Sequence, residues 1–157
     1  MIVVLIIVGF VGYSYYEIEN SNGNVNISIT SSGYNAQFNL TFTSIDLRSS
    51  NYSLWTNYST GGTTIDLADY EVPGNFQFGS VSLIEGNYTM IRLNLTNAEL
   101  TENGVAHKLN LLHSYAYVTG DFVIPAKVTT YFTLEFQLNG NINMTTHTFN
   151  PVIQVLN

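Results

Sequence analysis

Most of the chain alternates between apolar and polar residues with a period of two. The alternation is clearest in four stretches, at residues 25–29, 38–42, 91–95 and 132–138. Since successive side chains of a strand point to opposite faces, each stretch predicts a half-buried β-strand. No segment of ten or more residues shows a convincing helical pattern.

Two irregularities are expected within these strands. Ile45 and Leu47 continue the second stretch out of phase with Phe42, which predicts a β-bulge near residues 43–44. A last strand is expected over residues 149–156, where Pro151 indicates a sheet edge or a bulge because proline has no N–H for the ladder.

Turn-forming residues fall between the predicted strands. Asn103-Gly104 and Asn139-Gly140 predict tight hairpins, because such pairs tolerate the positive φ angles of the favoured two-residue turns. Many short strands with this punctuation predict an all-β fold, an antiparallel immunoglobulin-like β-sandwich. We place the sandwich at residues 25–157, behind an apolar strand at 1–12 and a polar linker at 13–24.

The apolar run at residues 2–12 differs from the rest of the chain. Even extended to Tyr16, a helix would cover only about 24 Å, against a membrane hydrocarbon core of about 30 Å. Most of its residues are β-branched, and Gly9 and Gly12 interrupt it, so an extended strand is favoured over a helix. A strand that is apolar on both faces must be buried on both faces.

We expect this strand to be buried in a neighbouring molecule. Extended at about 3.3 Å per residue, eleven residues would reach about 36 Å, enough to cross a whole sandwich. A head-to-tail contact that does not close on itself generates a filament of identical subunits. The side chains of the expected donor strand are Ile2, Val3, Val4, Leu5, Ile6, Ile7, Val8, Phe10 and Val11.

Composition narrows the possible functions. The chain has 4 Lys and Arg against 11 Asp and Glu, a net charge of -7, so the basic footprint of a nucleic-acid-binding protein is missing. The absence of Cys excludes disulfides and thiolate metal sites. No Gly-x-Ser-x-Gly nucleophile motif is present, and we expect no enzyme activity and no cofactor.

Metal binding has little support in the sequence. The spacing of His107 and His113 matches no familiar metal pair, and we expect ordinary surface or core histidines. Four acidic residues could supply oxygen ligands, but their spacing is not that of a calcium-binding loop, so we expect solvated loop acids. These residues are Asp46, Asp66, Asp69 and Glu71.

Several Asn-x-Ser/Thr triplets mark candidate sites of N-linked glycans, which would require an exported chain. A sheet face rich in Ser, Thr and Asn also produces such triplets by composition alone, and both interpretations stay open. The candidates are Asn26, Asn39, Asn51, Asn57, Asn87, Asn94 and Asn143.

Short motifs resemble a known family. The segment Gly86-Asn87-Tyr88-Thr89-Met90-Ile91-Arg92 is similar to the Gly-x-Tyr-x-x-Ile-Arg signature of uncharacterised archaeal and bacterial exported β-sandwich domains. Residues 43–47, 64–67 and 151–153 resemble further motifs of that family in the same order. Within these motifs, Tyr88 is expected to anchor the sandwich edge and Arg92 to need a carboxylate or carbonyl partner.

Within that family, the chain looks most like the subunits of archaeal thread filaments, which are surface fibres of thermoacidophiles. The resemblance implies an extracellular, N-glycosylated subunit of a cell-surface appendage. Each subunit would polymerise with identical copies by donor-strand complementation, without a stable membrane span in the assembled state. Adhesion or biofilm formation is the implied role.

The start of the chain departs from this family. The first basic residue is Arg48, whereas a secretory signal has Lys or Arg directly before its apolar core. We therefore expect either that Met1 is not the first residue of the encoded precursor or that its assigned start is wrong.

Two other classes stay open. In one, the chain is a type IV pilin-like subunit, and the apolar run is its truncated or atypical core helix. In the other, the chain is a membrane-anchored surface adhesin or carbohydrate-binding module, with Trp55, Tyr52 and Tyr58 as a stacking platform. Core or inter-subunit packing is the alternative interpretation of these aromatic residues.

Overall fold

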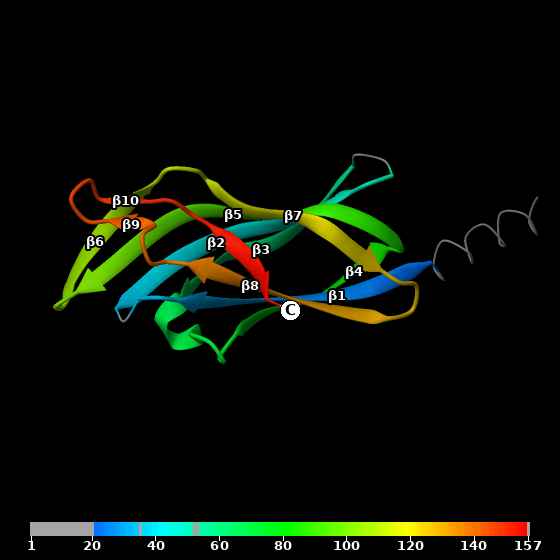
Figure 1. Cartoon of the computed structure of the whole chain (residues 1–157), viewed down its shortest axis with the longest axis horizontal. Coiled ribbons are helices and arrows are strands. Elements are labelled where there is room, and N and C mark those ends of the chain that lie inside the picture. Colours follow the sequence, from blue (N-terminus) through cyan, green and yellow to red (C-terminus); the bar gives the residue numbers. More distant parts are fainter. Residues whose placement is uncertain (1–20, 35, 52–53, 157) are drawn as a thin grey trace, which may run out of the picture.

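The computed structural model of the chain describes residues 21–34, 36–51 and 54–156. These residues form two β-sheets packed face to face as a sandwich (Figure 1). The strands are β1 (Asn22–Ser32), β2 (Gln37–Ser49), β3 (Trp55–Asp66), β4 (Phe76–Ile84), β5 (Gly86–Glu102), β6 (Val105–Leu111), β7 (Tyr115–Ile124), β8 (Thr129–Gln137), β9 (Ile142–Asn143), β10 (Thr148–Phe149) and β11 (Ile153–Leu156).

The predicted donor strand at residues 1–12 lies outside the described residues. Of the predicted linker at 13–24, only the end is described, and β1 begins within it at Asn22. The first apolar strand of the sandwich is therefore slightly longer than the alternation alone indicated.

The smaller sheet has the strand order β11-β8-β1-β4, and the larger sheet the order β3-β2-β5-β6-β10-β9. One edge of the long strand β5 pairs with β2. Its other edge pairs with two strands in succession, with β7 along the first part of β5 and with β6 along the last part. Most pairs are antiparallel, but β1 with β8 and β6 with β10 are parallel. The predicted all-β sandwich is confirmed, with these two parallel pairs as an addition.

The core lies between the sheets and is built from the apolar positions of the alternating pattern. Val25, Ile27 and Ile29 of β1 are at most 1% exposed. Phe42 of the larger sheet packs edge to face against Phe78 and Phe136 of the smaller sheet, with ring centroids 5.2 and 5.8 Å apart. Burying each such side chain contributes about 1.5–3 kcal/mol, so the alternation itself stabilises the sandwich.

The expected β-bulge is present. The register of β2 shifts between Phe42 and Ser44 in its pairing with both β3 and β5. The shift restores the inward orientation of Ile45 and Leu47, which are both fully buried. One extra residue therefore keeps the apolar side chains of a long strand on the core face.

The prediction of one last strand over residues 149–156 is wrong. Phe149 ends β10 in the larger sheet, and Ile153 begins β11 in the smaller sheet, so the chain crosses between the layers. Pro151 lies in the crossing segment, where its missing N–H breaks no ladder. The proline therefore marks a change of sheet.

The two predicted hairpins differ in outcome. Asn103 and Gly104 connect the paired strands β5 and β6 with φ angles of 51° and 77°, as expected. Gly140 also has a positive φ, of 76°, but the strands on either side of it, β8 and β9, lie in different sheets. The turn at Asn139-Gly140 is therefore not a hairpin, because a turn signal reports the local backbone and not the partner of the next strand.

Helical structure among the described residues is one 3₁₀ turn, η1 (Leu67–Tyr70). The Asp66 carboxylate caps it by accepting a hydrogen bond from the Ala68 N–H. The part of the chain that the structure describes contains no helix of the length and apolar character needed to span a membrane.

Candidate functional site

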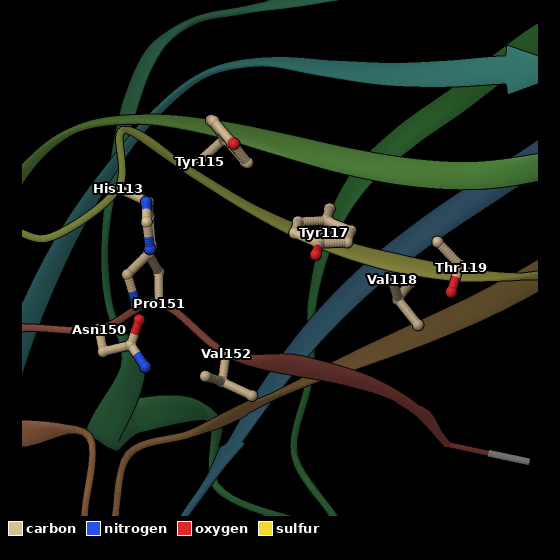
Figure 2. Close-up of a pocket in the computed structure, with 8 residues that line it drawn as sticks. All are labelled: His113, Tyr115, Tyr117, Val118, Thr119, Asn150, Pro151 and Val152. Carbon is tan, nitrogen blue, oxygen red and sulfur yellow. The ribbon is translucent and has the colours of Figure 1, made fainter.

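β7 and β11 are edge strands on the same side of the sandwich. Among the described residues, β7 pairs with β5 and β11 pairs with β8, and neither has a second partner. A groove of about 480 Å³ lies between β7 and the segment that leads into β11 (Figure 2). We call it the edge groove.

The backbone of β7 presents free hydrogen-bonding groups to this side. The Leu95 N–H donates to the Ser114 carbonyl at 2.8 Å, which sets the alternation of the ladder between β5 and β7. In an antiparallel ladder, only alternate residues bond to the partner strand. The N–H and C=O groups of Tyr115, Tyr117 and Thr119 therefore point away from β5.

The side chains of the edge groove are largely apolar. Tyr117 of β7 is 52% exposed and Val152 before β11 is 39% exposed. Val118 is half-buried and packs against the core beneath them. An unpaired edge above apolar side chains is the arrangement that accepts an added strand, because the edge supplies hydrogen bonds and the side-chain pockets supply specificity.

A polar cluster lies on the outer face of the larger sheet. Asp46 of β2 accepts hydrogen bonds on Oδ2 from Arg92 Nε and Nη2, at 3.1 and 2.5 Å, and from Asn94 Nδ2 at 2.7 Å. Its Oδ1 accepts from Asn57 Nδ2 at 2.6 Å. The expected partner of Arg92 is therefore a carboxylate.

Asp46 is not the solvated loop acid that we predicted. It lies on a strand, and its side chain is only 5% exposed. Burial opposes its ionisation, but the hydrogen bonds from Arg92, Asn94 and Asn57 outweigh burial and hold the pKa of Asp46 below its ordinary value. The alternating pattern missed this, because Asp46 occupies a polar position on the outer face and is covered by neighbouring side chains.

The histidines form no metal centre with one another in the described part of the chain. His107 lies next to His147, with ring centroids 5.9 Å apart, and His113 lies beside Tyr115 at the edge groove. The described residues contain no group of three or more His, Cys, Asp or Glu side chains able to hold a metal ion.

The candidate glycosylation sites have different surroundings. The amide nitrogens of Asn57 and Asn94 donate to Asp46, and the Asn26 side-chain oxygen is enclosed. Asn39 is half-buried. The exposed candidates are Asn51, Asn57, Asn87 and Asn143, and of these Asn57 is the one whose amide nitrogen donates to Asp46.

The predicted aromatic platform is not formed as proposed. Trp55 and Tyr58 are three positions apart on β3 and so project to opposite faces of the sheet, with Tyr58 packed against the core. Tyr52 lies outside the described residues. Trp55 instead lies over Arg92, whose Cζ is 4.3 Å from the ring centroid.

The fold places the protein among the β-sandwich proteins. Comparison with known families identifies the particular family. The chain belongs to the family described as "Domain of unknown function (DUF4382)", which matches residues 22–151. That the chain belongs to an uncharacterised family is confirmed. The signature at residues 86–92, the exported character of the family and the thread-filament subunit stay predictions. No curated protein sequence matches the chain.

Likeness to solved structures is weak. A leucine-rich repeat protein from Bacteroides thetaiotaomicron VPI-5482 is 13% identical over 86% of this chain and 14% of its own, with a TM-score of 0.35. A Bacteroides fragilis NCTC 9343 protein whose name suggests cell adhesion is 10% identical over 87% of this chain and 46% of its own, with a TM-score of 0.42. The chain thus spans less than half the length of either protein, and likeness at these TM-scores indicates no function for it.

Proposed function

We propose that this chain is a structural subunit of an extracellular surface filament, in which an extended segment of one copy adds to the open edge of the next. The observation that supports the proposal is the edge groove, where β7 and β11 both lack a second partner among the described residues. The proposed occupant is the apolar segment at residues 2–11 of a second copy.

The two surfaces are chemically complementary. An apolar strand supplies side chains to both faces, and the edge groove offers a side chain to each, because Tyr117 and Val118 are consecutive on β7 and point to opposite faces of the sheet. The free N–H and C=O groups of β7 supply a ladder to the incoming backbone. Because donor and acceptor are different parts of one chain, the contact propagates head to tail.

The particular assembly that we propose is the archaeal thread filament, on the strength of the motif resemblance at residues 86–92. This assignment places the protein on the cell surface, with N-linked glycans and a role in adhesion or biofilm formation. It involves no enzyme activity, cofactor or nucleic acid, and no stable membrane span in the filament.

Complementary variants of the full chain test the proposal. Ile6→Asp places a charge in the donor segment, and Thr119→Pro removes an outward N–H of β7 without removing a bond to β5. We expect each variant alone to remain folded and monomeric. Mixed together, they should form a discrete dimer and no filament, because one supplies only a donor and the other only an acceptor.

The Glu85 N–H donates to the Ser21 carbonyl, and because only alternate residues of β4 bond to β1, the Ser82 N–H points outward. Since β4 is also the opposite edge of the smaller sheet, Ser82→Pro is the matched control. It should polymerise normally, as judged by negative-stain microscopy and light scattering. Filaments of either single variant, or a mixture that stays monomeric, would contradict the proposal. A mature N-terminus beyond Gly12, measured by mass spectrometry, would also contradict it.

A further inference from the structure

We propose that the outer face of the larger sheet binds an acidic polysaccharide whose sugar rings carry carboxylates. The site, which we call the outer-face site, is formed by Trp55, Arg48, Arg92, Tyr115 and Tyr117. The inference goes beyond filament formation, since it rests on outward side chains of four strands, of which Tyr115 and Tyr117 also line the edge groove, and not on the free backbone of β7.

Strand register brings these residues together from four strands. Arg48 is the Cα partner of Trp55, and Arg92 is the Cα partner of Tyr117. Tyr115 is paired with Asn94, two residues beyond Arg92 on β5. Because residues paired across neighbouring strands project to the same face, two arginines and three aromatic rings share one surface.

The aromatic rings and the cations are in direct contact. The Cζ atom of Arg92 lies 4.3 Å from the ring centroid of Trp55 and 5.8 Å from that of Tyr115. The Cζ atom of Arg48 lies 6.0 Å from the Trp55 centroid. Asp46 holds the Arg92 guanidinium through Nε and Nη2, so the arrangement is fixed before any ligand arrives.

The rings remain accessible despite these contacts. Trp55 is 40% exposed, Tyr115 38% and Tyr117 52%. Met90, Arg92, Tyr115 and Tyr117 line a hollow of about 220 Å³ beside them. This is smaller than the roughly 300–1,000 Å³ of pockets for drug-sized ligands, and it suits a single ring of a longer chain.

The charge of the outer-face site is opposite to that of the whole protein. The chain has a net charge of -7 and only 4 Lys and Arg, and two of these four are Arg48 and Arg92. Asp46 neutralises Arg92. Arg48 has no carboxylate partner among the described residues, so the site carries an uncompensated positive charge.

These features together select the ligand class. Exposed aromatic rings provide flat apolar surfaces for the C–H face of a pyranose ring. A guanidinium binds a carboxylate by charge-assisted hydrogen bonds, and Arg is the residue best suited to do so. A polysaccharide of uronic acids presents both groups in every repeat, whereas an acidic peptide presents only the carboxylates.

The fluorescence of Trp55 provides a direct test, because it is the single tryptophan of the chain. Oligogalacturonate added to the full chain should change the emission saturably. A neutral oligosaccharide of the same length and polyglutamate should bind at least about tenfold more weakly, since each lacks one of the two interactions.

Two matched variants locate the site. Arg48→Gln should weaken binding of oligogalacturonate about tenfold by calorimetry, as expected for losing a charge-assisted hydrogen bond. Lys108→Gln removes the same charge from an exposed position on β6 and should leave affinity unchanged. Trp55→Ala should abolish binding, whereas Tyr131→Ala, at an aromatic ring 70% exposed on β8, should not.

Several results would overturn the inference. Equal affinity for the neutral sugar would remove the role of Arg48, and equal affinity for polyglutamate would remove the role of ring stacking. Equal effects of Arg48→Gln and Lys108→Gln would reduce the interaction to net charge. Thr119→Pro should still bind oligogalacturonate, so failure of strand addition and failure of this site are distinguishable.

Discussion

Asp46 and Arg92 face each other across β2 and β5 as Cα partners, and their side chains form an ion pair with 2.5 Å between Oδ2 and Nη2. The pair lies on the outer face of the sheet, where Trp55 covers the guanidinium. A strand position that is polar in the pattern thus holds a carboxylate that is almost completely buried.

Removing this carboxylate should destabilise the fold. Asp46→Asn leaves Arg92 without its charge partner and weakens the bonds from Asn57 and Asn94. We expect a loss of about 1–3 kcal/mol in the free energy of unfolding, less than for a fully buried pair because Arg92 is 31% exposed. Urea unfolding of the wild type and of the variant measures this difference in unfolding free energy. Asp121→Asn, at an exposed acid, is the control, and an equal loss there would contradict the prediction.

The contribution of Asp46 should persist into moderate acid. Its folded-state pKa is lowered, so the stabilisation is fully present above its unfolded pKa of about 3.9 and is lost as the pH falls through the folded value. The difference in unfolding free energy between wild type and Asp46→Asn should therefore stay constant from pH 7 to about 5 and shrink below about 4. A difference that already shrinks near neutral pH would refute this.

The close approach of β1 to the segment after β7 depends on a glycine. A Cβ atom added at Gly23 would lie 2.3 Å from the Pro125 carbonyl oxygen and 2.8 Å from Ile124 Cγ2. Gly23→Ala should therefore destabilise the protein by about 1–3 kcal/mol, measured by thermal unfolding. At Gly120 the nearest atom to an added Cβ is the outer end of the Phe122 ring, at 3.2 Å, so Gly120→Ala should cost clearly less.

Glycans, where present, should favour the exposed candidate sites whose amide nitrogens are not bound to Asp46. Attachment at Asn57 or Asn94 would use the amide nitrogen that donates to Asp46. We expect glycopeptide mass spectrometry of protein from the native cell to find sugar at Asn51, Asn87 or Asn143 and little at Asn57 or Asn94. High occupancy at Asn94 would show that the network around Asp46 is dispensable.

Local features of the chain were predictable from the sequence. The strands built on the four alternating stretches, the bulge after Phe42 and the hairpin at Asn103-Gly104 follow from the side-chain period and from the φ angles that single residues tolerate. The need of Arg92 for a partner was also expected, because its guanidinium carries several N–H donors in a geometry that a carboxylate or carbonyl can accept.

The partners themselves were decided only by the tertiary structure. The parallel pairing of β1 with β8, the crossing at Pro151 and the meeting of Trp55 with Tyr115 and Arg92 join residues far apart in the chain. Periodicity indicates which face of a strand is buried, but the competition among all edges for hydrogen bonds and apolar cover determines which strand lies next to it. For that reason the sandwich could be predicted from the amino-acid sequence, whereas the edge groove and the outer-face site could be found only in the folded chain.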